Sequence, residues 1–301
     1  MSEQQADSGL SWNERVIKEF RANNGRVGGM FEGAPMVLLT TMGRKTGKPH
    51  TNPAIYYKDG DRYLVFASNA GRDKNPDWYH NLLESPQVTL EIGTEEGAAK
   101  PFATRAEELK GEERDRYWEL QCTLDPGFRD YESKTDRKIP VVALRPLDLD
   151  GDNERSRMIG QQLIKHHSDL RGELARLRTA MEQALDGGGV DGTPAAELTE
   201  QLRSRCLTYC YGLQMHHIRE DGSFSAFEVR YPHLVPAITK LREQHHVVET
   251  ALAEFEEVLD KGLSGDGGDL ERLRGELDRV VAGLEAHFAY EEETLLPALE
   301  G

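Results

Sequence analysis

The chain has 301 residues and a formal net charge of −16, from 37 basic and 53 acidic side chains. This length predicts two domains, each large enough to bury a core of its own. Residues 1–150 carry 21 basic and 25 acidic side chains, and the rest of the chain carries 16 and 28. Neither half has the basic excess that binding to nucleic acid or to an anionic membrane requires, so both roles are disfavoured.

The chain shows no targeting or membrane signal. No apolar run approaches the roughly 18 residues of a membrane span, and the first ten residues lack the pattern of a signal peptide. Cys122, Cys206 and Cys210 form neither a CxxC pair nor an even disulfide set, so we interpret them as small core residues in a reducing compartment. A soluble cytoplasmic protein is expected, and a homo-oligomer is left open.

The first half alternates short strand patterns with a few helical ones. Strands are predicted at residues 36–43, 52–69, 87–93, 99–107 and 139–146, and helices at 12–23, 77–83 and 112–122. Residues 56–66 read as a hairpin whose tip is Asp59, Gly60 and Asp61. We therefore expect an α+β domain dominated by antiparallel strands, and a small barrel is its natural closure.

The second half is helical in period after a polar linker. Four amphipathic stretches are predicted at residues 153–185, 195–221, 233–260 and 269–298. Their lengths indicate an antiparallel four-helix bundle. The expected domains are residues 1–147 and 155–301, with a linker at 148–154.

Eight of the ten histidines lie beyond residue 151, and six of these form adjacent pairs at 166–167, 216–217 and 245–246. Neighbouring helix positions point about 100° apart, so we expect at most one member of each pair to face the bundle axis. Along each predicted helix, apolar residues recur every three or four positions, and this pattern marks the face that points to the axis. The pattern includes His167, His216 and His245, and on the last helix it includes His287. It also places Glu220 and Glu291 one turn after a histidine.

Helix lengths place these residues at similar depths. His167 and His216 lie roughly 27 and 33 Å from their shared loop at 1.5 Å per residue, and His245 and His287 lie roughly 22 and 27 Å from theirs. One layer can therefore hold four histidines and two carboxylates. Burying these groups without a cation costs several kcal/mol per charge, so a metal is predicted. Nitrogen and oxygen donors without thiolate favour iron over structural zinc.

The segments HHIRED, LREQHHVVETAL and HFAYEEETLLPAL resemble those of a hemerythrin, or HHE cation-binding, domain over residues 155–299. The resemblance implies a non-haem di-iron centre with terminal histidines and bridging carboxylates. Carried onto this chain, the ligands are His167, His216, Glu220, His245, His287 and Glu291. His246, Glu249 and Glu292 stay open as alternative ligands.

A basic stretch stands out in the first half. Residues 33–58 contain no acidic side chain but four basic ones. Arg44, Lys45 and Lys48 lie in the segment TTMGRKTGKPHTNP between two strands, and Lys58 ends the stretch. A glycine turn there can direct backbone N–H groups and basic side chains at a phosphate or carboxylate. The spacing of its glycines is not that of a Walker loop, so a nucleotide triphosphatase is disfavoured. A solvated basic hairpin is the alternative interpretation.

The segments LLTTMGRKTGKPHTNP, FASNAGRDKNPDWYHNL and LDPGFRDYESKTDRKIPVVAL occur in this order over about 110 residues, and together they resemble the deazaflavin-dependent nitroreductase family. That family implies a split β-barrel of the FMN-binding type that binds reduced coenzyme F420. By resemblance, the phosphate and polyglutamate tail is held by Arg44, Lys45, Thr46, His50, Thr51 and Asn52. The ring is lined by Ala67, Ser68, Asn69, Asp77, Trp78 and Tyr79. Phe128 and Tyr131 cap the acceptor side, with Tyr131 as the catalytic candidate. His50 and Asn69 depart from the arginine and lysine that are usual in the family, which predicts weaker or more pH-dependent binding of the tail.

The two resemblances together predict an F420-dependent oxidoreductase. It would pass hydride to a quinone, a nitro compound or a similar acceptor, while a di-iron bundle reduces or senses dioxygen, peroxide or nitric oxide. The alternative is a non-catalytic protein that binds oxygen or iron or senses redox state, and whose barrel only binds the deazaflavin. A third interpretation keeps the reductase active and makes the bundle a dioxygen scavenger.

Overall fold

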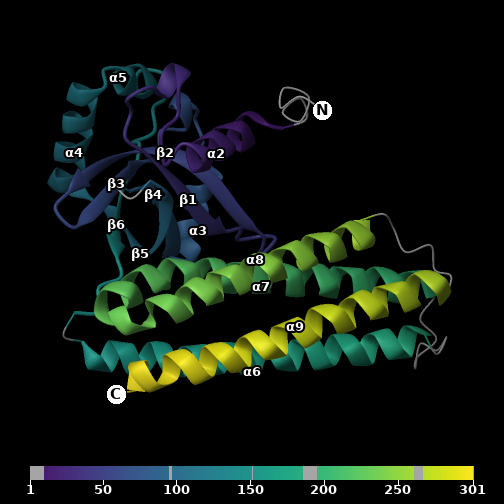
Figure 1. Cartoon of the computed structure of the whole chain (residues 1–301). Coiled ribbons are helices and arrows are strands. Elements are labelled where there is room, and N and C mark those ends of the chain that lie inside the picture. Colours follow the sequence, from purple (N-terminus) through teal and green to yellow (C-terminus); the bar gives the residue numbers. More distant parts are fainter. Residues whose placement is uncertain (1–9, 95–96, 151, 186–194, 261–266, 301) are drawn as a thin grey trace. The chain divides into compact units, whose positions relative to one another are not determined.

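The computed structural model describes residues 10–94, 97–150, 152–185, 195–260 and 267–300. Contacts between Cα atoms divide the chain into two compact units, one built on residues 1–148 and the other on most of the chain from Leu149 onward. Each unit is treated by itself (Figure 1). A linker at residues 148–154 stays a proposal, and the first bundle helix begins within it at Asn153. The segment between the first two predicted long helices, residues 186–194, lies outside the described residues, as do residues 261–266 of the break predicted at 261–269 before the last helix.

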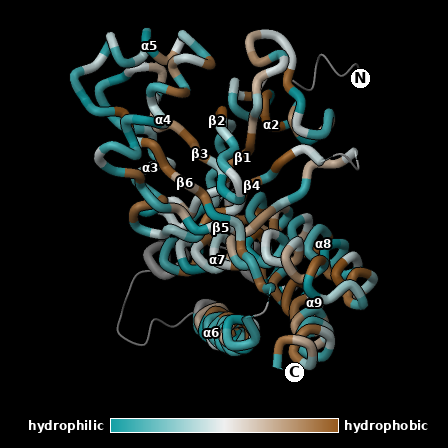
Figure 2. The backbone as a smooth tube through the Cα atoms, turned by 90° about the vertical axis from the view of Figure 1, so that its left-hand side faces the viewer, coloured by the Kyte–Doolittle hydropathy of each residue, from teal (hydrophilic) through white to brown (hydrophobic). Residues whose placement is uncertain are grey.

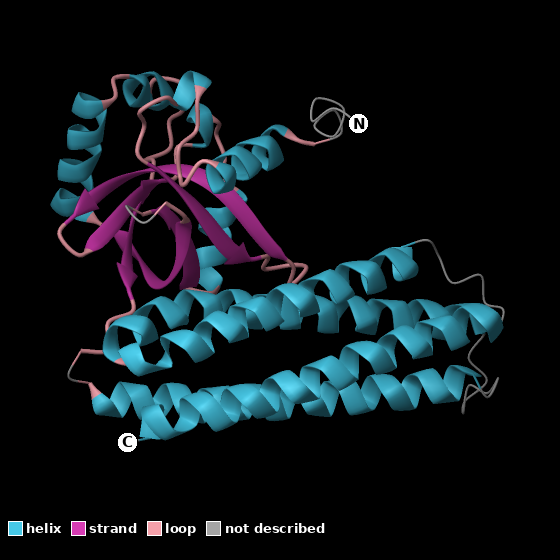
Figure 3. Ribbon diagram, in the orientation of Figure 1, coloured by secondary structure: helices cyan, strands magenta, loops and turns pink. Residues whose placement is uncertain are grey.

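Six antiparallel strands form the first unit, and they close into a barrel in the order β1-β2-β3-β6-β5-β4 (Figure 3). The strands are β1 (Met36–Met42), β2 (Pro49–Asp59), β3 (Arg62–Phe66), β4 (Gln87–Gly93), β5 (Ala99–Leu109) and β6 (Val141–Pro146). Pairing of β1 with β4, in which Leu39 faces Leu90, closes the ring. The α+β barrel expected from the sequence is thus confirmed. Closure pairs each strand on both sides, so no strand edge is left unpaired.

The strands form because they are rich in β-branched and apolar residues. β3 and β6 appear as hydrophobic runs in Figure 2, and Val65 pairs with Val142 where both side chains are fully buried. The predicted hairpin turns at Gly60, whose φ of +58° suits glycine. Arg62 and Asp59 pair across its tip, as the register of β2 and β3 requires.

Short helices surround the barrel. They are α2 (Trp12–Ala22), η1 (Gly29–Phe31), η2 (Asn69–Gly71), α3 (Asp77–Glu84), α4 (Gly111–Leu124) and α5 (Gly127–Glu132). α2 begins at a capping box in which Ser11 and Glu14 satisfy each other's backbone N–H groups. The sequence predicted α2, α3 and α4 but not α5, whose six residues are too few to show a helical period.

Four long helices form the second unit (Figure 3). They are α6 (Asn153–Leu185), α7 (Ala195–Arg230), α8 (Val235–Asp260) and α9 (Gly267–Glu300), with η3 (Pro232–Leu234) before α8. The predicted end of the second helix near residue 221 was wrong. The segment DGSFSAFEVR continues α7 to Arg230 because Phe224 and Phe227 are buried, and packing outweighs the weak helix propensity of its glycine and serines.

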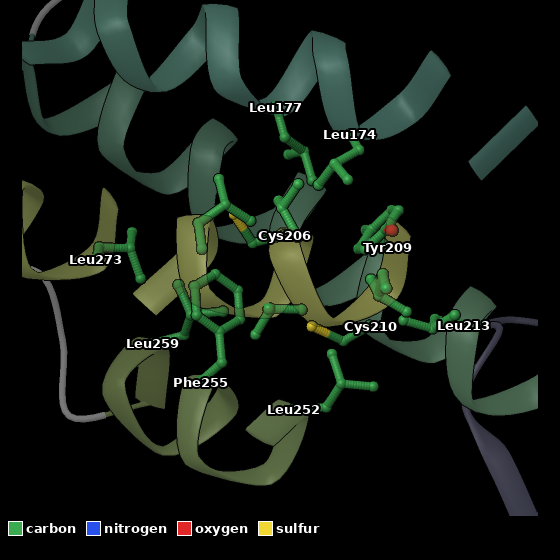
Figure 4. Packing of buried hydrophobic residues seen from close by; sticks show 14 of the residues in the cluster. Leu174, Leu177, Cys206, Tyr209, Cys210, Leu213, Leu252, Phe255, Leu259 and Leu273 are labelled. Atoms are coloured by element: carbon green, nitrogen blue, oxygen red, sulfur yellow. The ribbon is translucent and has the colours of Figure 1, made fainter. Parts of the chain in front are cut away.

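The bundle has a leucine-rich core, part of which Figure 4 shows. Cys206 and Cys210 lie in this core as free thiols. Burial raises the pKa of Cys206 to about 12, so this thiol stays protonated and unreactive at neutral pH. No helix in the described parts of the chain is long and apolar enough to cross a membrane.

Candidate functional sites

A cluster of buried histidines and glutamates lies inside the helical bundle. Its members come from all four long helices and are His167, His216, His217, Glu220, His245, His287 and Glu291. Each of them exposes 9% or less of its surface. Ionisable side chains are rarely buried to this degree unless they are paired or bind a metal.

The ligand atoms fall into two groups, and within each group all of them lie within 4.8 Å of one another. One group is His217, Glu220, His245 and His287, and the other is His167, His216, Glu220 and Glu291. Glu220 belongs to both groups. Two adjacent cation positions that share one carboxylate fit this arrangement.

Distances inside the cluster support this fit. The Nε2 atoms of His245 and His287 are 3.2 Å apart, and two nitrogen ligands at about 2.1 Å from one ion lie about 3 Å apart. Glu291 Oε2 is 3.4 Å from His167 Nε2 and 3.7 Å from His287 Nε2, so this carboxylate lies between the two groups. Imidazole and carboxylate donors without thiolate suit iron.

His217 lies in the cluster although it was not among the predicted ligands. The expectation that only one histidine of each pair faces the axis holds for His167 and His245, because His166 and His246 are exposed. It was wrong for the pair on α7, where His216 and His217 are both buried. The angle of about 100° between neighbouring helix positions aims each ring at a different group. One pattern in the sequence does indicate that both histidines can belong to the cluster. Glu220 follows His217 by three residues and His216 by four, and both spacings place side chains next to each other on a helix.

His167 and His287 each have an outer partner that holds the ring. His167 Nδ1 lies 2.8 Å from Glu292 Oε1, and the same oxygen accepts from Arg171 Nη1 at 2.9 Å. His287 Nδ1 lies 3.1 Å from the amide oxygen of Gln244. These contacts turn each Nε2 into the cluster, as outer partners of metal-binding histidines do. Glu292 is therefore placed behind His167 and not beside the other ligand atoms.

Glu292 is held as an anion. Its partial burial raises the pKa, but the hydrogen bonds with His167 and Arg171 lower it more, so the pKa of Glu292 lies below its ordinary value. Phe288 closes this side of the cluster, with its ring stacked on His167 at 4.1 Å between centroids. Phe288 also belongs to the apolar core, so it separates the histidines from water on that side.

The basic turn, residues 43–48, connects β1 and β2 in the barrel unit. The Gly43 N–H donates to the Lys48 carbonyl at 2.8 Å, and the Gly47 N–H donates to the Gly43 carbonyl at 2.7 Å. Arg44, Lys45 and Lys48 are exposed around it. The turn thus presents cationic side chains to solvent on a hydrogen-bonded frame.

The chain anchors this turn to α3. Asn81, which is buried, accepts from the Arg44 N–H at 3.2 Å and donates to Thr41 Oγ1 at 3.1 Å. Among the other residues predicted to hold the tail, Thr46 and His50 are exposed and Thr51 and Asn52 are half-buried. A Cβ at Gly43 would lie 2.7 Å from Thr46 Oγ1 and 2.8 Å from His50 Cδ2, so glycine lets these two side chains close over the turn.

Residues 67–75 form a loop after β3, which we call the ring loop because three residues predicted to line the deazaflavin ring lie in it. Ala67 is buried, and Ser68 and Asn69 are half-buried. Asn69 has a φ of +48°, and its side chain donates to the Lys74 carbonyl at 2.8 Å.

Arg137 holds the ring loop, a role that no motif or spacing along the chain indicates. Its guanidinium donates to the Ala67 carbonyl at 3.0 Å, the Ser68 carbonyl at 2.5 Å and the Arg72 carbonyl at 2.8 Å. It also donates to Asn75 Oδ1 at 2.5 Å. Burial lowers the pKa of Arg137, but an arginine remains charged at any ordinary pH.

The structure brings the ring loop together with the segment predicted to cap the acceptor. A Cβ at Gly71 would lie 2.7 Å from the Tyr131 carbonyl oxygen, so only a glycine allows this approach. Tyr131 is half-buried, which leaves part of its ring available to a ligand. Phe128 is 96% buried between Phe66 and Tyr131, which places it behind Tyr131 in the core.

The remaining predicted ring contacts lie on the first turn of α3. Asp77 is exposed, whereas Trp78 and Tyr79 pack in the barrel core. Burial, together with the nearby Glu108, raises the pKa of Tyr79 to about 12. The structure thus places Trp78 and Tyr79 as core aromatics.

The chain combines a closed antiparallel barrel, which carries a basic turn, with a helical bundle, which holds a buried cluster of histidines and carboxylates. These features are those expected of a cofactor-binding unit and a cation-binding unit. The family model of the F420H(2)-dependent quinone reductase matches residues 12–146, and that of the hemerythrin HHE cation binding domain matches residues 158–299. Proteins of Mycobacterium tuberculosis strains H37Rv and CDC 1551, each named F420H(2)-dependent quinone reductase, are 38% identical over 129 residues. The match covers 42% of this chain and 83% of each relative.

A solved structure described as an F420-H2 dependent reductase is 37% identical and is matched over 94% of its own length and 37% of this chain, with a TM-score of 0.33. The chain belongs to the F420H(2)-dependent quinone reductase family through its barrel, and its bundle is similar to the hemerythrin HHE cation binding domain.

Proposed function

We propose that the chain is an F420-dependent oxidoreductase whose bundle holds two iron ions. Reduced F420 supplies a hydride, that is, two electrons and one proton, to a quinone, nitro compound or similar acceptor. The iron pair supplies one-electron steps or two-electron chemistry with dioxygen, peroxide or nitric oxide. The observation that carries the proposal is the pair of ligand groups sharing Glu220 on a chain that also has the reductase barrel.

Within the barrel, we assign binding of the cofactor's anionic tail to the basic turn with His50, Thr51 and Asn52. The ring loop and the start of α3 (Asp77, Trp78 and Tyr79) would orient the deazaflavin. Tyr131 is proposed to contact the acceptor, since its side chain is only half-buried and its backbone carbonyl lies against Gly71 of the ring loop. Its hydroxyl can place a proton on the acceptor oxygen when hydride arrives, as reduction of a quinone to a quinol requires.

Within the bundle, five histidines and two glutamates would hold the iron pair. His217 joins the six ligands predicted from sequence, because its ligand atom lies in one group with those of His245 and His287. Phe288 and the leucines of the core would limit the access of water to the pair.

The test is an anaerobic titration of the iron-loaded full chain with reduced F420, following the deazaflavin band and the di-iron absorption together. Stoichiometric change of both bands is expected for an oxidoreductase in which the two sites exchange electrons. A response of the deazaflavin band alone, and only after a quinone is added, would leave a reductase beside a separate sensor or scavenger. Absence of turnover with every acceptor would favour the binding-protein alternative.

A further inference from the structure

Two segments of the barrel unit that meet at Tyr131 carry three exposed cations. Arg72 and Lys74 lie in the ring loop, and Lys134 follows α5 by two residues. We call Arg72, Lys74 and Lys134 the cationic rim. Within the part of the chain that the structure describes, no ion pair joins any of these three side chains to a carboxylate.

Other cations nearby have carboxylate partners. Lys138 Nζ lies 2.8 Å from Asp115 Oδ1. Arg129, on α5, pairs with Glu119, and its Nη1 lies 3.8 Å from Glu132 Oε2. A carboxylate partner weakens the attraction of a cation for a further anion, because the two opposite charges partly cancel. The cationic rim therefore keeps its charge available to a solute.

Lys134 is positioned by packing against the ring loop. A Cβ at Gly71 would lie 3.0 Å from Lys134 Cβ and 3.1 Å from Lys134 Cδ, so the aliphatic part of the lysine covers this glycine. Lys134 Nζ lies 5.6 Å from the centre of the Tyr131 ring, within the range of a cation–π contact. The ammonium is thus held beside the residue that is proposed to contact the acceptor.

Hydrogen bonds fix the backbone at the other two cations. The Arg72 carbonyl accepts from Arg137 Nε at 2.8 Å, and the Lys74 carbonyl accepts from Asn69 Nδ2 at 2.8 Å. Residues 72–74 carry two basic side chains and one acidic one, and residues 134–138 carry three and one. Both segments are therefore net positive in a chain whose formal net charge is −16. A local positive charge of this kind attracts anionic solutes.

We propose that the cationic rim selects the acceptor, so that the barrel reduces aromatic acceptors with a carboxylate or sulfonate group in preference to neutral ones. The inference rests on the proposed function, in which Tyr131 contacts the acceptor, and it names the substrate class of that site. Lys134 is the specificity-determining residue. Its ammonium pairs with the anionic group, while the Tyr131 ring contacts the aromatic body. The anionic tail of the coenzyme is assigned to the basic turn and does not require the rim.

The experiment compares four full-length proteins, namely wild type, Lys134→Met, Lys134→Glu and the control Lys138→Met. Methionine keeps an aliphatic side chain against Gly71 and removes the charge, and the control removes a cation that is paired with Asp115. The two acceptors are naphthoquinone sulfonate, which is anionic, and menadione, which is neutral. For each protein, kcat/KM is measured under anoxia with saturating reduced F420, at low and at high salt. The dissociation constant of F420 is measured separately.

Lys134→Met should lower kcat/KM for naphthoquinone sulfonate about fivefold, the effect of one pair of charges about 4 Å apart in water. Lys134→Glu adds a repulsion of similar size and should lower it about 25-fold. Both losses should shrink at high salt, because ions screen exposed charges. For menadione, kcat/KM should stay within about twofold, since a neutral acceptor is not attracted by the charge. Lys138→Met, and the dissociation constant of F420 in every variant, should match wild type.

The proposal is overturned if Lys134→Met lowers kcat/KM for both acceptors by the same factor, because Lys134 would then only support Tyr131. It is also overturned if Lys138→Met gives the same loss, or if the loss does not depend on salt. Weaker binding of F420 by Lys134→Met would assign the lysine to the coenzyme and overturn it as well. If wild type reduces neither acceptor, the proposed function itself fails, which is a different result from reduction of both acceptors without a response to Lys134.

Discussion

At the residue scale, the proposed function depends on buried side chains that contact residues from distant parts of the chain. Glu220 is 91% buried, and its ligand atom belongs to both groups of potential ligands. Arg137 makes four hydrogen bonds to a loop about 65 residues earlier in the chain. In both cases one side chain holds several partners, so single substitutions should have large and specific effects.

Replacing Glu220 with Gln should remove iron from both positions, because the amide is neutral and cannot bridge two cations. We expect less than half of the wild-type iron content by elemental analysis of the reconstituted full chain. Glu293→Gln is the control, since Glu293 is exposed on the same bundle. Retention of full iron content by Glu220→Gln would show that Glu220 does not bridge.

Replacing Arg137 with Met should loosen the ring loop. Loss of four hydrogen bonds at a net ~0.5–1.5 kcal/mol each predicts a stability loss of about 2–6 kcal/mol in urea unfolding. The affinity for F420 should fall about tenfold, since the loop would have to be ordered on binding. Lys138→Met, a neighbouring exposed cation, should bind F420 like wild type. An unchanged dissociation constant for Arg137→Met would separate the ring loop from the cofactor.

At the element scale, the barrel is stabilised where helices contact strands and loops. All three tryptophans, at positions 12, 78 and 118, lie in the barrel half, so tryptophan fluorescence reports its unfolding without interference from the bundle. Two contacts can be tested in this way. One joins the β2–β3 hairpin to α4, and the other joins the ring loop to α5.

The hairpin contact should depend on pH. Asp59 Oδ2 accepts from Arg62 Nε at 2.9 Å and from Tyr117 Oη at 2.6 Å, and these two hydrogen bonds, that of Tyr117 first, lower the pKa of Asp59. A carboxyl whose pKa is lower in the folded state stabilises above its ordinary pKa, and this stabilisation is lost as the pH falls through the lower folded value. Asp59→Asn should therefore weaken the barrel near neutral pH and flatten its loss of stability in acid. Parallel stability curves for the two proteins would contradict this assignment.

The contact between the ring loop and α5 should tolerate no side chain at Gly71, which has a φ of +79° and lies against Tyr131. Gly71→Ala should lower the free energy of unfolding by about 2–4 kcal/mol, from left-handed strain plus the steric clash. Gly29→Ala is the matched control, because Gly29 has a φ of +63° but no atom within 4 Å, so only the strain of about 1 kcal/mol applies. Equal losses in the two variants would show that the approach of Tyr131 is not constraining.

At the scale of the whole molecule, the chain joins a unit of the F420H(2)-dependent quinone reductase family to a unit that is similar to the hemerythrin HHE cation binding domain. The barrel and the bundle each have a buried hydrophobic core. Whether electrons pass between the sites is then a question of chemistry on the full chain.

Removing the metal from the full chain should divide its activities. Without iron, anoxic reduction of a quinone by reduced F420 should stay within about twofold of the loaded protein, because the barrel holds the residues proposed for hydride transfer. Consumption of dioxygen should fall to background and return when iron is restored. A loss of the anoxic reaction on chelation would place the iron on the path of the electrons.

The sequence by itself determined the elements and the class of each half. Period-two and period-3.6 patterns, together with turn residues, depend on neighbours along the chain. All six strands and the central parts of the long helices therefore lie within a few residues of their predicted places. The spacing of apolar residues that selected His167, His245 and His287 also depends only on neighbours along the chain. The second helix, in contrast, was ended too early, because burial of Phe224 is not visible in its local composition.

Only the tertiary structure decided which side chains meet. His217 belongs to the cluster because a helix that packs against neighbours on two sides can point adjacent rings at different neighbours. The spacing of apolar residues along the chain, in contrast, assigns a single inward face to each helix. Arg137, Glu292 and Gln244 act through partners that are distant in sequence, or that lie on another helix. The division of the ligand atoms into two groups, and the hydrogen bonds that hold the ring loop, are therefore properties of packing, which the spacing of residues along the chain does not encode.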